Sequence, residues 1–195
     1  MGTITSHMTM SMDGFIADPH DGVAELFGWY EAGTVAVPTA GERWSFMVDE
    51  RSAQMLREVM ATTGALVCGR RLFDLTSGWD DGHPVGAPVV VVTHHPPQDA
   101  GRWKTISFAG SVTNGIAAAR QIAGDKDVTI ASASIAAQAL DAGLVDEVTI
   151  SLVPVLLGKG IPYFASLARA PHRFDDPVIT PGSGVTHLRY AVRRA

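Results

Sequence analysis

The stretch from Asp127 to Phe164 constrains the fold of this chain more than any other part of it. Asp127–Ala131 is a short run with β-branched residues, as in a strand. Ile135–Leu140 carries apolar residues at helical spacing, and Gly143 is placed to end a helix in the left-handed conformation. Val145–Val153 alternates apolar and polar residues, as a half-buried strand does. The stretch therefore predicts a βαβ unit followed by a glycine-containing loop.

Three small residues, Ser132, Ala133 and Ser134, stand where the first strand of this unit gives way to its helix. Backbone N–H groups at the start of a helix have no partner within the helix, and the helix dipole favours negative charge there. Small side chains let an anion approach those groups. The sequence therefore predicts an anion-binding site at the start of this helix.

Length and composition indicate one globular domain spanning residues 1–195, with 46% hydrophobic and 18% charged residues. The formal net charge is −5, and it divides unevenly into −7 for residues 1–98 and +2 for the remainder. No stripe of Lys and Arg interrupts this acidic balance. Binding to the phosphate backbone of DNA or RNA is therefore not expected.

The single cysteine, Cys68, excludes a disulfide within the chain and fits a reducing compartment. No apolar run reaches membrane-spanning length, and the N-terminal residues lack the charged and apolar regions of a signal peptide. The histidines show no metal-ligand spacing. We therefore expect a soluble, cytoplasmic protein without a metal site, in which Cys68 is part of the core.

The remaining periodic segments predict an α/β protein: a mixed sheet with flanking helices and an antiparallel C-terminal end. The expected elements are strands at Ile4–Ser11, Ala65–Cys68, Pro88–Thr93 and Lys104–Phe108; helices at Asp49–Thr62 (ended by Gly64), Leu72–Thr76 and Val112–Ala123; and a hairpin of Arg173–Thr180 and Val185–Val192 around the turn Pro181–Gly184.

Asp18–Val48 is the least regular part of the chain and is rich in glycine, proline and aromatic residues. A segment of this length is too long for a connector, so it covers a site or carries short elements of its own. Its aromatic residues favour the first interpretation. We expect this segment to shape a substrate pocket.

Polar groups follow three of the predicted strands: Gly69-Arg70-Arg71, Thr93-His94-His95 and Ser132-Ala133-Ser134. Open α/β sheets bind ligands beyond the carboxyl ends of their strands, so these groups together predict a phosphate-binding cradle. Taken singly, each signal is weak. For the two arginines a solvated or salt-bridged turn is an equal alternative, and for the two histidines a structural role is the simpler interpretation.

Several short motifs are spread over the chain on both sides of Asp18–Val48: Met10–Ala17 (MSMDGFIA), Gly69–Arg71 with Trp79 beyond it, Pro88–Thr93 (PVVVVT), Leu144–Glu147 (LVDE), and Pro154–Gly160 (PVLLGKG) followed by Phe164. This set resembles the dihydrofolate-reductase-like superfamily. Within it, the chain is most similar to the C-terminal reductase domain of the bacterial riboflavin-biosynthesis deaminase-reductase. With one cysteine, the chain cannot carry the zinc signature of the deaminase half.

The resemblance implies the dihydrofolate-reductase-like three-layer fold, a mostly parallel central sheet with a C-terminal antiparallel hairpin and flanking helices. It implies an NADPH-dependent oxidoreductase that acts on CH–NH, C=N or C=O groups. The hydride acceptor would be a small pteridine, pyrimidine or related heteroaromatic substrate, as in dihydrofolate reductase or 5-amino-6-ribosylaminouracil reductase. The cofactor supplies the hydride, and the protein orients it.

By position, the resemblance also implies which residues contact each ligand. Ile16 and Ala17 would lie near the nicotinamide; Gly69, Arg70, Arg71, Leu72, Thr93 and His94 would hold the adenosine 2′-phosphate end; and Ser132, Ala133, Ser134, Ile135 and Ala136 would place the pyrophosphate. Asp13 is the candidate catalytic residue, and Asp13, Trp44, Pro154 and Gly158 are weaker candidates for substrate contact. The chain departs from the pattern at Ala131-Ser132-Ala133, where the superfamily usually has a glycine pair, and at Leu72, which replaces a frequent hydroxyl residue.

Several of these side chains have structural alternatives. Asp13, on a turn after the first strand, either binds substrate or relays a proton, or it accepts hydrogen bonds from turn amides; the two are equally supported. Asp49 lies where a folate reductase keeps its pterin-binding acid, but an N-cap is the simpler explanation. Trp29, Trp44 and Trp79 either stack on a flat heterocycle or pack in the core.

Two other functions remain open. The glycine-free turn would also fit a non-catalytic ligand-binding module on a reductase scaffold. Alternatively, a flavin or deazaflavin could use the same phosphate-binding edge in place of NADPH. We expect a homodimer in each case, because the C-terminal hairpin offers an exposed strand edge.

Overall fold

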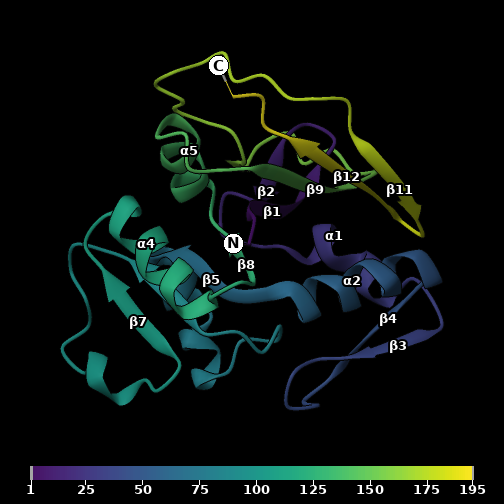
Figure 1. The fold of residues 1–195 in the computed structure, drawn as a ribbon. Coiled ribbons are helices and arrows are strands. Elements are labelled where there is room, and N and C mark those ends of the chain that lie inside the picture. The colour runs from purple at the N-terminus through teal and green to yellow at the C-terminus, as the bar shows by residue number, and fades with distance from the viewer. Residues whose placement is uncertain (1, 195) are drawn as a thin grey trace.

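The computed structural model describes residues 2–194 and centres on one eight-stranded sheet (Figure 1). Its strand order is β11 (Val178–Gly182), β12 (Val185–Ala191), β9 (Glu147–Val153), β1 (Ile4–Ser11), β8 (Asp127–Ile130), β5 (Thr63–Gly69), β6 (Val89–Val92) and β7 (Ile106–Ala109). The strands from β9 to β7 run parallel, whereas β12 is antiparallel to β9 and β11 is antiparallel to β12. The predicted fold class is confirmed.

The predicted βαβ unit consists of β8, α5 (Ala133–Asp141) and β9. Its two strands are not neighbours, because β1 lies between them and pairs with both. Gly143 has φ +67°, and the N–H of Leu144 returns to the carbonyl of Ala139 at 2.9 Å, so the helix ends as predicted. The second strand begins at Glu147, two residues later than predicted, although Val145 is buried.

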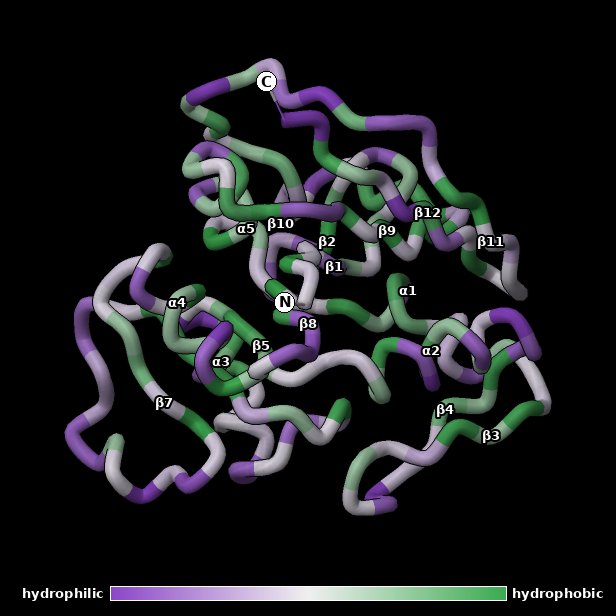
Figure 2. Tube along the Cα trace, in the orientation of Figure 1, coloured by the Kyte–Doolittle hydropathy of each residue, from purple (hydrophilic) through white to green (hydrophobic). Residues whose placement is uncertain are grey.

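Both faces of the parallel strands are apolar at the β5–β6 side of the sheet. In β5, Ala65 and Val67 pack against the layer formed by α4 (Val112–Ala123) and α5, whereas Leu66 and Cys68 point to the other face and pack with Phe73 of α3 (Arg70–Leu75). Cys68 is 1% exposed, as expected for a core residue. In Figure 2 the β5 strand is coloured as hydrophobic, whereas the loops around β7 are coloured as hydrophilic.

The α2 helix (Glu50–Thr62) is capped by Asp49, whose carboxylate accepts from the N–H groups of Arg51 at 3.0 Å and Ser52 at 3.2 Å. The N-cap interpretation of Asp49 is therefore confirmed. The expected role of Gly64 as the end of this helix is wrong, since β5 already begins at Thr63. A Cβ at Gly64 would lie 2.8 Å from the Cα of Ala123, so close packing against the end of α4 requires glycine there.

The irregular segment carries short elements of its own: α1 (Ala24–Phe27), the 3-10 turn η1 (Gly28–Glu31), and an antiparallel hairpin of β3 (Val35–Pro38) and β4 (Ser45–Val48). Trp29 is 3% exposed and packs with Val37 and Phe46 in a core cluster against α2. Core packing is therefore the role of Trp29, and the segment is more ordered than the sequence indicates.

The C-terminal hairpin is shorter and tighter than predicted. Its first strand begins at Val178 rather than Arg173, and Pro181 and Gly182 pair with β12 instead of forming the turn. Only Ser183 and Gly184 remain as the connection, with Gly184 at φ +70°. The remaining elements are β2 (Phe15–Ala17), β10 (Ile161–Pro162), η2 (Ser77–Asp81) and η3 (Ala100–Arg102). No helix among residues 2–194 is long and apolar enough to span a membrane.

Candidate functional site

Two of the predicted ligand-binding turns meet at the carboxyl edge of the sheet. Gly69 ends β5, and a Cβ built there would lie 3.1 Å from the Oγ of Ser132 and 3.7 Å from Cγ1 of Ile135. Ser132 follows β8, which is the direct neighbour of β5. A glycine at position 69 thus lets the turn before α3 approach the turn before α5. We call the groups at Gly69–Arg71, Thr93–His94 and Ser132–Ser134 the cradle.

The start of α5 has no side-chain cap. Ser132 is at the N-cap position with φ −168° and ψ 128°, and its carbonyl accepts from the N–H of Ala136 at 2.9 Å. Its hydroxyl caps no N–H group of the helix. Ile135 and Ala136 are buried in the core, whereas Ser134 is exposed. Within the predicted pyrophosphate segment, Ser132–Ser134 is therefore the part at the surface.

Arg70 joins the first turn of the cradle to the loop after β6. Its Nε donates to both carboxylate oxygens of Asp74, at 2.8 and 3.0 Å, and its Nη1 donates to the carbonyl of His95. The hydroxyl of Thr93 accepts from the N–H of His95 at 3.1 Å, while His94 is exposed. The structure thus places the Arg70 turn against His95, the residue that follows Thr93 and His94.

Arg71 forms a bidentate ion pair with Asp21, with Nε–Oδ1 and Nη2–Oδ2 distances of 2.8 and 2.7 Å. The hydrogen bond from this carboxylate raises the pKa of Arg71. The Arg71 side chain is 66% exposed, so water screens the pair and it contributes little to stability. Both cradle arginines are thus salt-bridged in this structure, which is one of the two alternatives that the sequence left open.

Leu72 and the two β2 residues lie against apolar neighbours. Leu72 packs on the core cluster that contains Phe73, and Ala17 is 7% exposed in β2, where it pairs with Ile161. Ile16 packs against the α4–α5 core layer. The predicted contacts of Ile16, Ala17 and Leu72 with a cofactor remain predictions.

The Asp13 carboxylate links two loops at the end of β1. It accepts from the Ser11 hydroxyl at 2.6 Å and from the N–H groups of Leu157 at 3.2 Å and Gly158 at 2.7 Å. These hydrogen bonds, led by that of Ser11, lower its pKa. The turn-amide role of Asp13 is therefore present in the structure, and it brings the predicted residue Gly158 next to Asp13. Pro154 is exposed in the same loop region.

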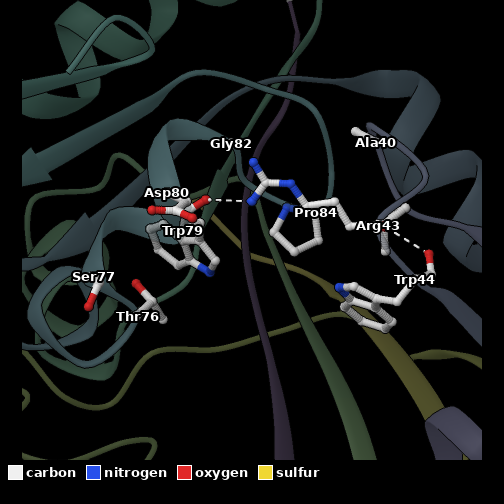
Figure 3. Close-up of a pocket in the computed structure, with 10 residues that line it drawn as sticks. Ala40, Arg43, Trp44, Thr76, Ser77, Trp79, Asp80, Gly82 and Pro84 are labelled. Atoms are coloured by element: carbon white, nitrogen blue, oxygen red, sulfur yellow. Dashed lines mark hydrogen bonds between the residues drawn. The ribbon is translucent and has the colours of Figure 1, made fainter.

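A cavity of about 360 Å³ lies between the loop of the β3–β4 hairpin and η2 (Figure 3). We call it the hairpin pocket; the residues used below are Arg43, Trp44, Thr76, Trp79 and Asp80. Trp44 was among the weaker substrate candidates, and it lines this cavity, whereas Asp13, Pro154 and Gly158 do not. The sequence reasoning missed Arg43, Thr76 and Asp80. The signal that could have found them is in the sequence, where Trp44 directly follows Arg43 and Trp79 directly precedes Asp80.

The η2 wall of the pocket is a left-handed turn. Ser77, Gly78, Trp79, Asp80 and Asp81 all have positive φ, between 50° and 62°. Such a conformation is strained for residues other than glycine and persists where surrounding contacts fix it. Here the Asp81 carboxylate accepts from the N–H groups of Lys104 at 2.9 Å and Thr105 at 2.8 Å. The pocket wall is thus held by contacts to a distant part of the chain.

No protein-family model matches the chain, and no curated protein matches it. Solved structures do. A putative riboflavin biosynthesis protein from Shewanella sp. PV-4 superposes with a TM-score of 0.72 at 22% identity, over 98% of this chain and 99% of that one. Dihydrofolate reductase from Enterococcus faecalis, in complex with NADP(H) and RAB-propyl, gives 0.59 at 12% identity, over 98% and 97%.

The chain has a dihydrofolate-reductase-like fold. Acinetobacter baumannii RibD also shares this fold, with a TM-score of 0.60 at 15% identity, over all of this chain but only 59% of RibD. This is the fold that the sequence motifs indicated. At these identities the likeness establishes the fold, and the activity must be argued from the residues of the cradle and the pocket.

Proposed function

We propose that this protein is a reductase that uses NADPH to reduce a small pteridine-like, pyrimidine-like or related heteroaromatic substrate. The observation that carries the proposal is the contact between the Gly69 turn and the uncapped start of α5 at Ser132, with Arg70 and Arg71 beside it. The fold supports it, since the dihydrofolate reductase that shares it is in complex with NADP(H).

The cradle residues fit the phosphate groups of a dinucleotide. The first N–H groups of α5 have no side-chain cap, and the exposed Ser134 adds a hydroxyl donor near them. The Arg70 and Arg71 side chains are exposed, so their ion pairs with Asp74 and Asp21 are weak, and both arginines can exchange these partners for phosphate at small cost. In this proposal Ser132–Ala136 holds the pyrophosphate, and Gly69–Leu72 with Thr93 and His94 holds the 2′-phosphate end.

Bound NADPH supplies the hydride, and the protein's residues orient the reactants and exclude water. We place Ile16 and Ala17 beside the nicotinamide. Asp13 has a lowered pKa and is therefore ionised at neutral pH. An ionised carboxylate accepts hydrogen bonds, so we assign Asp13 to binding an N–H group of the substrate rather than to donating a proton.

The test is a titration with NADPH followed by tryptophan fluorescence, in wild type and in two variants. We expect saturable binding that Arg71→Ala weakens by about tenfold, consistent with the loss of one charge-assisted phosphate contact. Arg57→Ala is the matched control, because Arg57 is an exposed arginine of α2 paired with Glu50. Absence of saturable binding at millimolar NADPH would overturn the proposal.

A second candidate function is a non-catalytic binding module, which the glycine-free turn Ala131-Ser132-Ala133 favours. In that case the protein binds a pterin or flavin but consumes no NADPH with any member of a substrate panel. A flavin- or deazaflavin-dependent reductase is distinguished by turnover that requires the added flavin. The same binding and turnover assays therefore separate the three functions.

We also propose a homodimer formed through the C-terminal hairpin. β11 is the edge strand of the sheet, and its Val178 and Ile179 side chains are 55% and 59% exposed. An exposed apolar edge strand is a surface that a second copy can cover. Size-exclusion chromatography with light scattering tests this, and a 20.6 kDa species is the negative result. The single domain spanning residues 1–195 and the cytoplasmic location remain predictions.

A further inference from the structure

A second cavity, of about 450 Å³, lies between α2 and the strands β1, β9 and β12, and we call it the groove. Val148 and Ile150 of β9 pack on the α5 side of the sheet. Glu147 and Thr149, which alternate with them, point to the opposite side and line the groove. They lie at the start of β9, and Thr5 lies near the start of β1, whereas the cradle lies beyond the carboxyl ends of the strands. The groove is therefore separate from the proposed cofactor site.

A chain of hydrogen bonds leads from the start of α2 into the groove. The Asp49 carboxylate accepts from the Ser52 hydroxyl at 2.6 Å, and the Ser52 Oγ lies 3.1 Å from Nε2 of His187. The Ser151 hydroxyl joins Nδ1 of His187, at 3.0 Å, to Nε2 of His7, at 3.1 Å. Ser52 and Ser151 are 0% exposed and His187 is 4% exposed. The two histidines line the groove, so the chain ends there at His7.

The direction of each hydrogen bond in this chain follows from its Asp49 end. A hydroxyl has one hydrogen, and that of Ser52 goes to Asp49, so Nε2 of His187 is the donor to Ser52. Burial lowers the pKa values of His187 and His7 to about 4, so both rings are neutral at pH 7. Nδ1 of His187 therefore accepts from Ser151, whose oxygen accepts from Nε2 of His7. His7 is thus an Nε2–H tautomer with a lone pair on Nδ1.

The lone pair of His7 belongs to a row of three side chains on the floor of the groove. Nδ1 of His7 forms no hydrogen bond with another residue of the described chain. In the sheet, His7 is next to Thr149, and Thr149 is next to Arg189 of β12. Arg189 is loosely held, since its Nη1 lies 4.0 Å from the Oε1 of Glu58 in α2. The row therefore offers an acceptor at His7, a donor at Arg189 and a hydroxyl between them that can do either.

The lining of the groove discriminates among classes of ligand. None of the described residues that line it is Phe, Tyr or Trp, so no ring is available to stack on a flat heterocycle. No group of three or more His, Cys, Asp or Glu among residues 2–194 could hold a metal ion. An anion would face the Glu147 carboxylate and the lone pair of His7, and an ammonium group has no lone pair to accept from Arg189. A hydroxyl group donates and accepts through one atom, so it matches the whole row.

We infer that the groove is a second binding site, for an uncharged molecule with several hydroxyl groups, of which one donates to Nδ1 of His7 and another accepts from Arg189. The site lies at the other end of the strands from the cradle, so the inference does not depend on the proposed reductase function. The ligand would extend the chain of hydrogen bonds that reaches Asp49. Since Asp49 also accepts from the N–H of Ser183 at 2.9 Å, this chain connects the groove to the β11–β12 turn.

The first measurement is the tautomer of His7, from long-range ¹H–¹⁵N NMR spectra of the ¹⁵N-labelled protein at pH 7.5. We expect a proton on Nε2 and none on Nδ1, for both His7 and His187. A proton on Nδ1 of His7 would overturn the inference, because the ring would then present a donor to the groove.

The second measurement compares four five-carbon probes by NMR titration: xylitol, pentane-1,5-diol, 1,5-diaminopentane and glutarate. Xylitol should shift the His7 ring signals saturably and bind about tenfold more tightly than the other three. Equal binding of the diol would show that the inner hydroxyls play no part, and tighter binding of the diamine would show attraction of any cation to the acidic side chains. Either result would overturn the inference, as would the absence of binding by both xylitol and its stereoisomer D-arabinitol.

Two variants test the residues of the row. Thr149→Val removes the hydroxyl but keeps the shape of the side chain, and should weaken xylitol binding about fivefold. His7→Phe removes the lone pair and should weaken it about tenfold. Thr113→Val, at an exposed position of α4, and His20→Phe, in an exposed turn, are the matched controls and should bind xylitol as the wild type does.

Unchanged affinity for xylitol in both groove variants would contradict the inference. Thr149→Val leaves the chain from Asp49 to His7 intact, so its result holds even where His7→Phe lowers stability. Thr149→Val should bind NADPH as tightly as the wild type does in the fluorescence titration. A protein that binds xylitol but no NADPH would keep the groove assignment and lose the reductase proposal, and the reverse result would do the opposite.

Discussion

The cradle and the hairpin pocket lie at opposite ends of α3, yet they are built in different ways. The cradle consists of strand ends in a parallel sheet, where neighbouring strands bring Gly69 so close to Ser132 that a Cβ at position 69 would lie 3.1 Å from the Ser132 Oγ. The pocket consists of a hairpin loop and a left-handed turn, both outside the sheet. Sheet topology alone places the cradle, whereas the pocket depends on contacts that strain the backbone at η2 and fix it there.

The cradle and the pocket also differ in whether their arginines have carboxylate partners. The cradle arginines are neutralised by Asp74 and Asp21, whereas Arg43 in the pocket has no carboxylate partner in the described chain. The cradle must therefore release carboxylates to bind a phosphate, while the pocket can accept an anion directly. Substitutions in the pocket wall should mainly affect stability, and substitutions in the cradle should mainly affect affinity for NADPH.

The largest effect is expected for Gly78→Ala in the pocket wall. Gly78 has φ +61°, and a Cβ there would lie 2.8 Å from the Trp103 ring and 3.0 Å from the Phe73 ring. Left-handed backbone strain and overpacking together should lower the free energy of unfolding by about 2–4 kcal/mol. Urea denaturation followed by circular dichroism measures this change.

Gly101→Ala is the matched control for that substitution. Gly101 lies in η3, and a Cβ there would meet no atom within 4 Å. It should change the free energy of unfolding by less than about 0.5 kcal/mol. Similar effects of the two substitutions would mean that η2 is not fixed by its neighbours.

The difference between the cradle and the pocket also explains which of the two could be predicted from the sequence. Alternation in β9, the apolar runs of β5 and β6, and the cap at Asp49 are local patterns that decide the structure. The strand ends that form the cradle follow from those patterns. Parallel strands place their carboxyl ends along one edge, so Gly69 and Ser132 could be expected to meet.

The pocket could not be predicted, because local preferences oppose its structure. Four of the five residues from Ser77 to Asp81 are not glycine, and nothing in their sequence indicates positive φ. Asp81 fixes the turn by accepting from amides more than twenty positions away, at Lys104 and Thr105. The pairing of Arg71 with Asp21 is likewise long-range. Such contacts leave no periodic signal.

Acidification should loosen the pocket wall more than the cradle. Burial lowers the pKa of His83 to about 4, and its Nδ1 accepts from the N–H of Val85 at 3.1 Å. Between pH 6.5 and 4 the unfolded chain therefore binds more protons at this site than the folded chain, so stability falls as pH falls through that window. From pH 6.5 to 5 the loss is at most about 2 kcal/mol.

His83→Asn isolates this contribution, because burial also lowers the pKa values of His7 and His187 to about 4 and they act in the same direction. The variant should lose less stability between pH 6.5 and 5 than the wild type does, measured by urea denaturation at each pH. His94→Asn, at an exposed position of the cradle, serves as the control and should keep the wild-type slope. Identical slopes in all three proteins would contradict the prediction.

A smaller effect is expected from the close approach of the two cradle turns. Gly69→Ala places a Cβ 3.1 Å from the Ser132 hydroxyl, which must give way by a few tenths of an ångström. NADPH affinity should fall by about tenfold. Ser132→Gly should tighten binding by several-fold, and in that background Gly69→Ala should cost little, because the crowded hydroxyl is gone. Fluorescence titration of the wild type, the two single variants and the double variant with NADPH measures how far the two substitutions depend on each other. Additive changes in binding free energy would mean that the phosphates bind elsewhere.

The smallest effect should come from releasing a cradle arginine. Asp21→Asn removes the carboxylate that holds Arg71 at 2.7 Å, so the guanidinium becomes as available as that of Arg43. We expect NADPH to bind about threefold more tightly at low salt, with the gain disappearing at high salt because the Arg71 side chain is exposed to water. Asp99→Asn releases Arg102, which lies outside the cradle, and should leave the affinity unchanged. Weaker binding by Asp21→Asn would show that Asp21 positions Arg71 for the ligand rather than competing with it. Arg71 and Arg43 would then differ in how their guanidinium groups are positioned, and not in whether these groups are free to bind an anion.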